Sequence, residues 1–263
     1  MSTSAPEHEP EPAVLRERRE RVLVVTINRP DQRNAVNAAV AAGIAAALDA
    51  LDADDGLAAG VITGAGRGFC AGMDLKAFVA GESPYAADRG FAGITQRASA
   101  KPLIAAVEGF AVAGGLEVAL SCDLIVAARG ARLGIPEVKR SLVAAGGALL
   151  RLPRVLPRNV AMELALTGEP IDAERAHQLG LVNRLTEPGQ ALGVAVELAA
   201  AIAENGPLAL AASKRILVES VDWPEAEFFA RQGAIAGPVM GSEDAREGAT
   251  AFAQKRPPIW RGR

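Results

Sequence analysis

The chain has 263 residues, enough for one large domain or two small ones with a substantial hydrophobic core. Half of the residues are hydrophobic and only 4% are aromatic, so we expect pockets lined mainly by aliphatic side chains and backbone. The net charge of −3 argues against a general surface for nucleic acid or for anionic membranes.

The cysteines and the N-terminal composition indicate the compartment in which the protein works. Cys70 and Cys122 make neither a disulfide framework nor a C-x-x-C zinc motif, and their apolar surroundings predict small hydrophobes in a reduced compartment. Residues 1–12 are acidic and proline-rich, without the pattern of a signal or transit peptide, and predict a disordered tail. No run of about 18 uncharged apolar residues exists. We therefore expect a cytoplasmic protein without a membrane span.

The first part of the chain alternates strands and helices. The β-branched run Val22–Asn28 predicts a strand that ends before Pro30. A helix capped by Asn37 follows, with its apolar residues on one face, and residues 60–63 predict the next strand. This order suggests a right-handed crossover onto a parallel neighbour. Further strands are expected at residues 103–107, 123–128 and 132–136.

The second part of the chain is predominantly helical. Between the two parts, residues 77–99 show weak periodicity and a Ser83-Pro84 break, and they predict a mobile, substrate-covering segment. Beyond Ala145, one strand-like run is expected at 181–185, Asp172 fits an N-cap, and Gly180 fits the position after a helix end. Helices are predicted over 145–152, 158–167, 172–179, 189–204, 207–221 and 242–253. The helical tail cannot bury its apolar faces alone, so we expect it to pack on the core or on another subunit.

The stretch GFAVAGGLEVALSCD, residues 109–123, carries the main functional signal. Its one carboxylate, Glu117, stands in an apolar run, and such local conflicts are expected at functional sites. Gly114 and Gly115 precede the carboxylate at a predicted helix N-terminus, where backbone N–H groups are free. Free donors beside a buried carboxylate suit oxyanion stabilisation and proton transfer. The alternative is a close-packed helix whose Glu117 forms a salt bridge elsewhere.

Other chemistries have weaker support. Phe69 stands where the third glycine of a G-x-G-x-x-G dinucleotide loop belongs, and no G-K-[ST] follows. A hydrolase triad is unsupported, because the histidines are His8 in the tail and His177 near a helix end, and no G-x-S-x-G elbow exists. Metal chemistry lacks a ligand cluster. We therefore expect neither a metal nor a separate cofactor.

Two glycine-rich turns, Cys70–Asp74 and Ala113–Gly115, each follow a predicted strand. In a parallel sheet both turns lie at the same edge, where ligands bind. Glu117 comes one helical turn after the second, and Glu137 follows a proline after enough chain to return near it. Two carboxylates and two backbone N–H groups can thus converge. Such a site suits a carbonyl that becomes an enolate while protons or water are handled beside it.

At these residues the sequence resembles the crotonase (enoyl-CoA hydratase/isomerase) family. The resemblance covers about Val22 to Lys255. Its strongest pieces are Asn28-Arg29-Pro30 with Asn34-Ala35, GRGFCAGMDLKAF (66–78), KPLIAAVEGFAVAGGLEVALSCDLIVAA (101–128), GIPEVK (134–139) and ALTGEPIDAERAHQLGLVNRL (165–185). It implies an α/β fold: a spiral of ββα turns over 13–200, then a helical trimerisation region over 201–263. The implied assembly is a homotrimer or a hexamer built from two trimers.

The resemblance also implies hydration of a 2-enoyl-CoA thioester to a 3-hydroxyacyl-CoA. The N–H groups of Met73 and Gly114 would form the oxyanion hole for the thioester oxygen. Glu117 and Glu137 would hold a water that adds to C3 while a proton goes to C2, and which glutamate is the acid stays open. Two nearby carboxylates titrate as a coupled pair.

Several alternatives to hydration stay open. They are double-bond isomerisation, hydration of an unusual acyl group, and a non-catalytic acyl-CoA-binding or RNA-binding role. Against RNA binding, no helix carries a Lys/Arg stripe and the net charge is negative. Both glutamates are present, which argues against a pure binder and favours hydration over isomerisation.

The resemblance implies further contacts to CoA. The channel would be lined by Ala71, Asp74, Leu75 and Lys76; Arg29 and Arg33 would meet the phosphates; and Phe252 and Lys255 would reach a neighbouring subunit's site. Each has a simpler explanation: Arg29 and Arg33 as solvated turn residues, Asp74 as a helix cap and Lys255 as a solubilising residue.

Two departures from the family pattern leave the acyl preference open. Met73 stands where hydratases often have a small residue. The turn AAGGA, residues 144–148, replaces one that is richer in proline and glycine.

Overall fold

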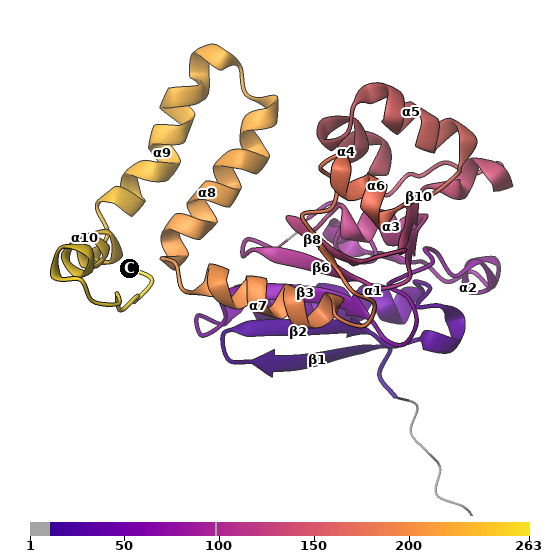
Figure 1. The fold of residues 1–263 in the computed structure, drawn as a ribbon, viewed down its shortest axis with the longest axis horizontal. Coiled ribbons are helices and arrows are strands. Elements are labelled where there is room, and N and C mark those ends of the chain that lie inside the picture. The colour runs from indigo at the N-terminus through magenta and orange to yellow at the C-terminus, as the bar shows by residue number, and fades with distance from the viewer. Residues whose placement is uncertain (1–10, 98) are drawn as a thin grey trace, which may run out of the picture.

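A six-stranded sheet organises the body of the protein (Figure 1). The computed structural model describes residues 11–97 and 99–263. The first strand pairs antiparallel with the second, and all other neighbours are parallel. In spatial order the strands are β1 (Val14–Arg19), β2 (Val22–Ile27), β3 (Ala59–Gly64), β6 (Leu103–Val107), β8 (Leu124–Ala128) and β11 (Arg184–Thr186). The parallel strands are confirmed, whereas β1 was not predicted.

A smaller second layer turns the chain into a spiral. It is a three-stranded sheet of β7 (Phe110–Val112), β9 (Arg132–Gly134) and β10 (Ile171–Asp172). Isolated bridges from Cys70 to Ala111 and from Val36 to Met73 extend this layer. Each turn of the chain passes through the large sheet, then this layer, then a helix; β6, β7 and α3 (Gly114–Ala119) make one such turn. The ββα spiral implied by the family resemblance is confirmed.

Helices cover both faces of the large sheet. On one face lies α1 (Ala38–Ala53), whose N-cap is Asn37 as predicted, because the Asn37 side chain accepts from the Val40 N–H at 3.1 Å. On the other face lies α7 (Ala191–Ala203), which buries an alanine at every fourth residue (Figure 1). Successive strand residues alternate between these two clusters, so strands buried on both sides appear as continuous apolar runs.

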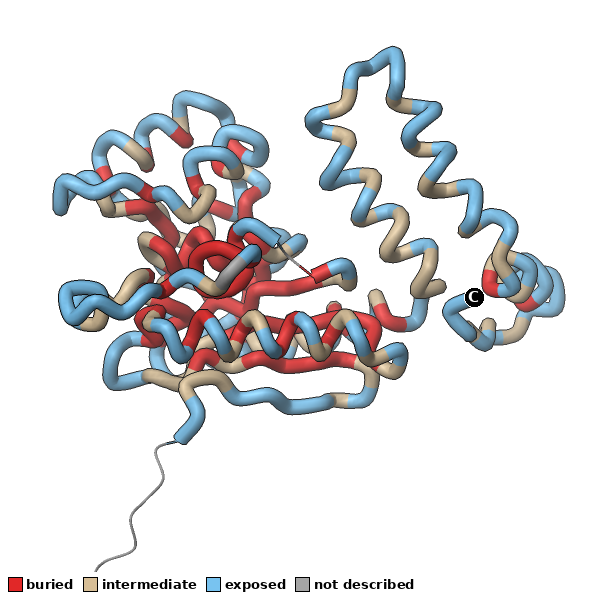
Figure 2. The backbone as a smooth tube through the Cα atoms, turned by 180° about the vertical axis from the view of Figure 1, so that it is seen from behind, coloured by how far each residue is buried: buried red, intermediate tan, exposed pale blue. Residues whose placement is uncertain are grey.

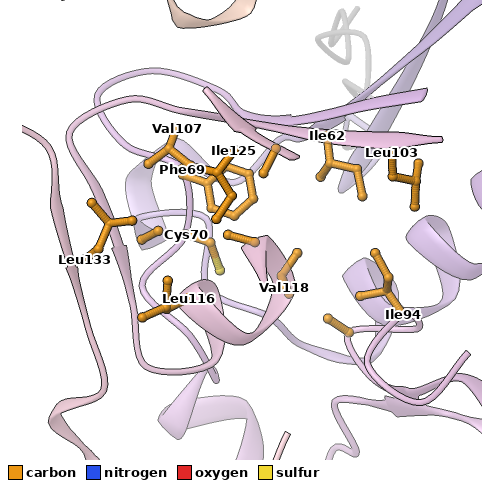
Figure 3. Packing of buried hydrophobic residues seen from close by; sticks show 14 of the residues in the cluster. Ile62, Phe69, Cys70, Ile94, Leu103, Val107, Leu116, Val118, Ile125 and Leu133 are labelled. Atoms are coloured by element: carbon orange, nitrogen blue, oxygen red, sulfur yellow. The ribbon is translucent and has the colours of Figure 1, made fainter. Parts of the chain in front are cut away.

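The short helix α3 is embedded in the core beneath the sheet. Leu116 and Val118 on α3 lie together with Phe69 and Cys70 (Figure 3), and all four are fully buried. Burial raises the pKa of the Cys70 thiol to about 12, so Cys70 is a neutral apolar side chain, as expected. Close packing therefore fixes α3 and the glycine-rich turn that precedes it.

The second part of the chain is mainly helical, as predicted, but some helices begin or end at other residues than expected. Asp172 caps α6 by accepting from the Arg175 N–H at 2.7 Å, and Gly180 has a positive φ after that helix, as predicted. The helix expected from 145 begins at 148, since the turn at Gly146 and Gly147 precedes it. The other helices are α2 (Leu75–Val79), α4 (Ala148–Val155), α5 (Arg158–Thr167), α6 (Ala173–Gln178), α8 (Pro207–Glu219), α9 (Phe228–Met240) and α10 (Glu243–Gln254). The short elements are β4 (Tyr85–Ala86), β5 (Gly90–Phe91) and the 3₁₀ turns η1 (Pro30–Gln32), η2 (Ala87–Arg89), η3 (Pro136–Arg140), η4 (Ser220–Asp222) and η5 (Glu225–Glu227).

The C-terminal helices α8, α9 and α10 form an arm that extends away from the body (Figure 1). Figure 2 shows that α8 and α9 are exposed or half-buried along their whole length. The predicted boundary at residue 200 falls within the last turn of α7, so the arm begins a few residues later. In the described residues no single helix is long and apolar enough to cross a membrane. Among these residues, one pair of helical segments is long and apolar enough when taken together: α7 and residues 207–222, which are bent by 110° relative to each other.

Two further predictions were a disordered tail over residues 1–12 and a mobile segment over residues 77–99. Residues 1–10, including His8, lie outside the described residues. Residues 11 and 12 accept hydrogen bonds from the Asn28 side chain at 3.1 and 3.3 Å. The segment 77–99 contains η2 and the paired strands β4 and β5, and its expected mobility stays a prediction.

Candidate active site

The two glycine-rich turns lie directly against each other. Gly72 has φ +91°, and a Cβ there would fall 2.8 Å from the Gly114 nitrogen and 3.3 Å from the Val112 carbonyl oxygen. A Cβ on Gly115 would fall 2.1 Å from the Cys70 carbonyl oxygen. Only glycine allows so close an approach of the two backbones, which explains both glycines and confirms that the turns converge.

Two backbone N–H groups at this junction are free to bind a ligand. Neither the Met73 N–H nor the Gly114 N–H donates to an acceptor within the described residues. Gly114 begins α3, and its predecessor Ala113 is held at φ 54° and ψ −132°, a strained conformation for a residue with a Cβ. Both residues line the same cavity of about 300 Å³. Free donors beside one cavity are what an oxyanion hole requires.

Glu117 lies in the first turn of α3, and it is 3% exposed. The Ala148 N–H donates to its Oε1 at 3.1 Å. A Cβ on Gly146 would lie 2.5 Å from its Oε2, so a larger residue there would have to displace the carboxylate. Within the described residues Glu117 forms no ion pair, so the alternative of a salt-bridged helix residue is wrong.

Opposing effects set the protonation of Glu117. Burial raises the pKa of this carboxyl, while the N–H groups of the Gly146–Ala148 turn and the positive charge of Arg151 oppose the rise. These donors and this positive charge stabilise the ionised form of Glu117 although the side chain is buried. Such a carboxylate is suited to accept a proton from a bound water.

Glu137 faces the same cavity from η3, directly after Pro136. Its Oε2 is buried without a hydrogen-bond partner in the described part of the chain. Burial, and then the negative charge of Glu117, raise the pKa of Glu137 to about 7, against the effects of its own backbone N–H and of Arg140. At neutral pH Glu137 therefore carries a proton for much of the time, and the two carboxyls titrate as a coupled pair.

The cavity brings together many of the residues singled out in the sequence. Its wall includes Glu117, Glu137, Met73 and Gly114, together with Arg33, Ala71 and Leu75. The segment 77–99 contributes Tyr85 and Phe91, whose rings meet edge to face with centroids 5.8 Å apart. This segment therefore lies beside the site, as expected of a covering segment.

Other predicted CoA contacts lie elsewhere. Arg29 and Asp74 form an ion pair at 2.9 Å, and the Asp74 side chain accepts from the Lys76 and Ala77 N–H groups at 3.1 Å. The alternative that Asp74 caps a short helix is confirmed. Arg29, Asp74 and Lys76 do not line the cavity.

On the arm, Phe252 is 88% exposed, and it and Lys255 lie away from the cavity. The roles of these five residues in CoA binding stay predictions.

Some residues of the site carry no local signal in the sequence. The turn Gly146–Ala148 holds Glu117, and Arg140, Leu142 and Val143 complete the wall beside Glu137. Only the AAGGA turn pointed to this region, through its departure from the family pattern. Among the described residues no group of three or more His, Cys, Asp or Glu side chains is placed to hold a metal ion.

This fold and this site belong to one class of protein. A family model described as enoyl-CoA hydratase/isomerase matches residues 17–263, and the chain belongs to this family.

The solved structure of enoyl-CoA hydratase EchA1 from Mycobacterium marinum is 60% identical and superposes with a TM-score of 0.95. That match covers 96% of this chain and 100% of the other. Enoyl-CoA hydratase EchA19 of Mycobacterium tuberculosis is 44% identical over 259 residues, covering 96% of this chain and 97% of the relative. Mevalonyl-coenzyme A hydratase of Aspergillus fumigatus is 38% identical over 250 residues, covering 91% of each.

Proposed function

We propose that this protein is an enoyl-CoA hydratase, which adds water across the 2,3 double bond of a 2-enoyl-CoA to give a 3-hydroxyacyl-CoA. The observation that carries the proposal is the single cavity shared by Glu117, Glu137 and the two free N–H groups of Met73 and Gly114. The hydratase names of the relatives support the same activity.

The substrate thioester oxygen accepts from the Met73 and Gly114 N–H groups in this mechanism. As water adds to C3, negative charge moves onto that oxygen, and two fixed donors stabilise the resulting enolate. Because the donors belong to rigidly packed turns, little reorganisation accompanies the charge movement.

The two glutamates handle the protons. The Glu117 carboxylate takes a proton from the water as its oxygen bonds to C3, and protonated Glu137 gives its proton to C2. One turnover leaves Glu117 protonated and Glu137 ionised, and transfer of one proton from the first to the second restores the starting state. The unequal environments of the two carboxyls support this assignment of base and acid.

Coenzyme A enters this reaction as part of the substrate, so no separate cofactor is proposed. Arg33, Ala71 and Leu75 line the cavity, which supports the predicted contacts of Arg33 with the CoA phosphates and of Ala71 and Leu75 with the CoA channel. We assign the protein to the cytoplasm on the basis of its free cysteines alone.

The arm supports a proposal about assembly. Helices α8 and α9 bury none of their residues, while Leu217 and Phe229 are 73% and 79% exposed. A homotrimer, or a hexamer of two trimers, covers these side chains and gives Phe252 and Lys255 access to a neighbouring subunit's site.

An absorbance assay tests the activity. Purified protein is mixed with crotonyl-CoA and with longer 2-enoyl-CoAs, and loss of the enoyl-thioester absorbance is followed. Glu117→Gln and Glu137→Gln each lower kcat by about 10²–10⁴-fold, the usual contribution of a general acid or base, with little change in ligand binding. Glu163→Gln, an exposed carboxyl on α5, serves as the control and keeps full activity.

Two outcomes contradict the proposal. Full activity of either variant refutes the two-carboxylate mechanism. Absence of turnover by the wild type on every enoyl-CoA, with binding intact, favours isomerisation or a binding role instead.

A further inference from the structure

Arg151 is a half-buried cation on α4 that the reaction scheme above does not use. Its Nη2 donates to the Thr95 carbonyl oxygen at 2.6 Å, and its Nη1 donates to the Gly146 carbonyl oxygen at 3.4 Å. Within the described residues it has no carboxylate partner in an ion pair, unlike Arg154 one turn later, which pairs with Asp222 at 3.3 Å. A partly buried guanidinium satisfied only by backbone carbonyls is costly and calls for a specific role.

Arg151 and Glu117 both contact the Gly146–Ala148 turn. A Cβ on Gly147, where φ is +111°, would fall 2.1 Å from Arg151 Nη1, so the cation occupies the space above this α-carbon. Gly146 closely approaches Glu117 Oε2, and the Ala148 N–H donates to Oε1. The same short turn therefore contacts both the cation and the carboxylate.

The Thr95 contact joins this turn to a second wall of the cavity. Thr95 is buried and follows β5, whose Phe91 lines the cavity together with Tyr85. Arg151 thus ties the segment after β5 to the turn that holds Glu117. Loss of the side chain removes this link between the two segments.

We propose that Arg151 is a positioning residue for Glu117, which clamps the Gly146–Ala148 turn against the carboxylate through hydrogen bonds to Thr95 and Gly146. It acts through Glu117 and does not touch the substrate. The proposal rests on the proposed function, since it concerns the base of the hydration step.

Electrostatics adds a measurable consequence. The titratable or charged groups that face Glu117 are Arg151 and Glu137. Those that face Arg151 are Glu117, Arg154 and the Cys122 thiol, which burial keeps neutral. The Arg151 charge lowers the pKa of Glu117, so neutralising it raises that pKa. The base is then protonated over a wider range, and the acid limb of the kcat/KM profile moves to higher pH.

The test compares Arg151→Gln, Arg151→Lys and the control Arg154→Gln, which removes the same charge from the exposed side of the same helix. The kinetic readouts are kcat, KM and the pH profile with crotonyl-CoA. A second readout needs no turnover: infrared titration of the Glu117 carboxyl, identified by subtraction of Glu117→Gln. Arg151→Gln lowers kcat by about 10–100-fold with little change in KM, because misplacement of a reacting group by about 1 Å costs about that much.

The titration separates the charge of Arg151 from its geometry. Arg151→Gln raises the Glu117 pKa by about one unit, as loss of a nearby opposite charge does. Arg151→Lys keeps the pKa but still lowers kcat, because an ammonium lacks the planar fork that reaches two carbonyls. Arg154→Gln leaves both readouts unchanged.

Failure of this proposal differs from failure of the proposed function. Wild-type turnover with an Arg151→Gln variant of unchanged kcat and Glu117 pKa overturns the positioning role alone. If the wild type hydrates no enoyl-CoA, the infrared titration decides, and an unshifted Glu117 overturns the role there as well. If Arg151→Gln does not fold, Arg151→Lys decides. A wild-type kcat in Arg151→Lys overturns the positioning role.

Discussion

The body and the arm bury their apolar residues in opposite ways. Every residue of β6 is buried, and α7 buries four alanines against the same sheet. Helices α8 and α9 bury none, although Leu217 and Phe229 are large apolar side chains. The contrast is visible in Figure 2, where buried residues gather in the body. The body therefore supplies its own core, whereas the apolar surface of the arm calls for cover from outside.

The two regions differ in chemistry as well as in packing. The cavity that holds Glu117, Glu137 and the free N–H groups is lined entirely by residues of the body. The arm carries Phe252 and Lys255, the predicted contacts to a neighbouring site. Changes in the body should act on catalysis and folding, and changes in the arm should act on association.

The largest contrast is expected from truncating one phenylalanine in each region. Phe69 is fully buried beside α3, so Phe69→Ala lowers the free energy of unfolding by about 3–5 kcal/mol. Phe229→Ala, in dilute protein, changes it by less than about 0.5 kcal/mol, because the side chain is already exposed. Denaturant unfolding at two protein concentrations measures both values. Equal losses in dilute protein would place Phe229 in the core and erase the contrast.

The second prediction tests what covers the arm. Phe229→Asp places a charge in the proposed interface and weakens self-association by about 30-fold, the loss typical of one central interface residue. Analytical ultracentrifugation gives the mass over a concentration series. Val79→Asp, at an exposed apolar residue of the body, is the matched control and leaves the mass unchanged. A wild-type chain that sediments as a monomer at all concentrations would refute the assembly.

The sequence predicted the body better than the arm for a physical reason. Strands buried on both faces, such as β2 and β6, are continuous β-branched or apolar runs, and they were found. Strand β1 was missed because it is an exposed edge strand with a charged sequence, VLRERR. Helix α9 was missed because Gly233, Gly237 and Pro238 interrupt its pattern. Its helical form depends on context that local propensity does not report.

The site shows the same division between local and distant information. Glu117 was found because one carboxylate in an apolar run is conspicuous, and the two glycine turns were placed together because both follow parallel strands. The contacts of Gly146 and Ala148 with the Glu117 carboxylate were not predicted. These residues come from a later turn of the spiral, and no local pattern states which side chain a turn will meet.

The third prediction compares two glutamates with opposite shifts. In the body, burial raises the pKa of Glu137 to about 7; on the arm, the Arg256 guanidinium lowers the pKa of half-buried Glu247 to about 2. Glu137 donates a proton, so kcat/KM falls as pH rises above about 7, by about tenfold per unit. A pH–rate profile from pH 6 to about 9 measures this limb.

Three variants assign that limb. Arg140 opposes the raised pKa of Glu137, so Arg140→Gln raises it further and moves the limb to higher pH. Lys139→Gln is the control, because Lys139 pairs with Glu169 at 2.5 Å and faces away from the cavity. Glu247→Gln leaves the profile unchanged. A limb that moves equally in all three variants would belong to another group.

The smallest effect is expected on the exposed side of α8. Arg215 pairs with Glu219 at 2.7 Å and is 61% exposed, so Arg215→Gln lowers the free energy of unfolding by about 0.3–0.5 kcal/mol. Its neighbour Lys214 faces the body instead, where its Nζ donates to Asp123 at 2.7 Å and to the Lys101 carbonyl oxygen at 2.9 Å. Lys214→Gln therefore costs more, since it leaves shielded acceptors without a charged donor. Thermal unfolding of both variants at low and high protein concentration gives the comparison. If Arg215→Gln costs as much as Lys214→Gln only at high concentration, a second copy shields the Arg215 pair, and the arm gains its cover by association.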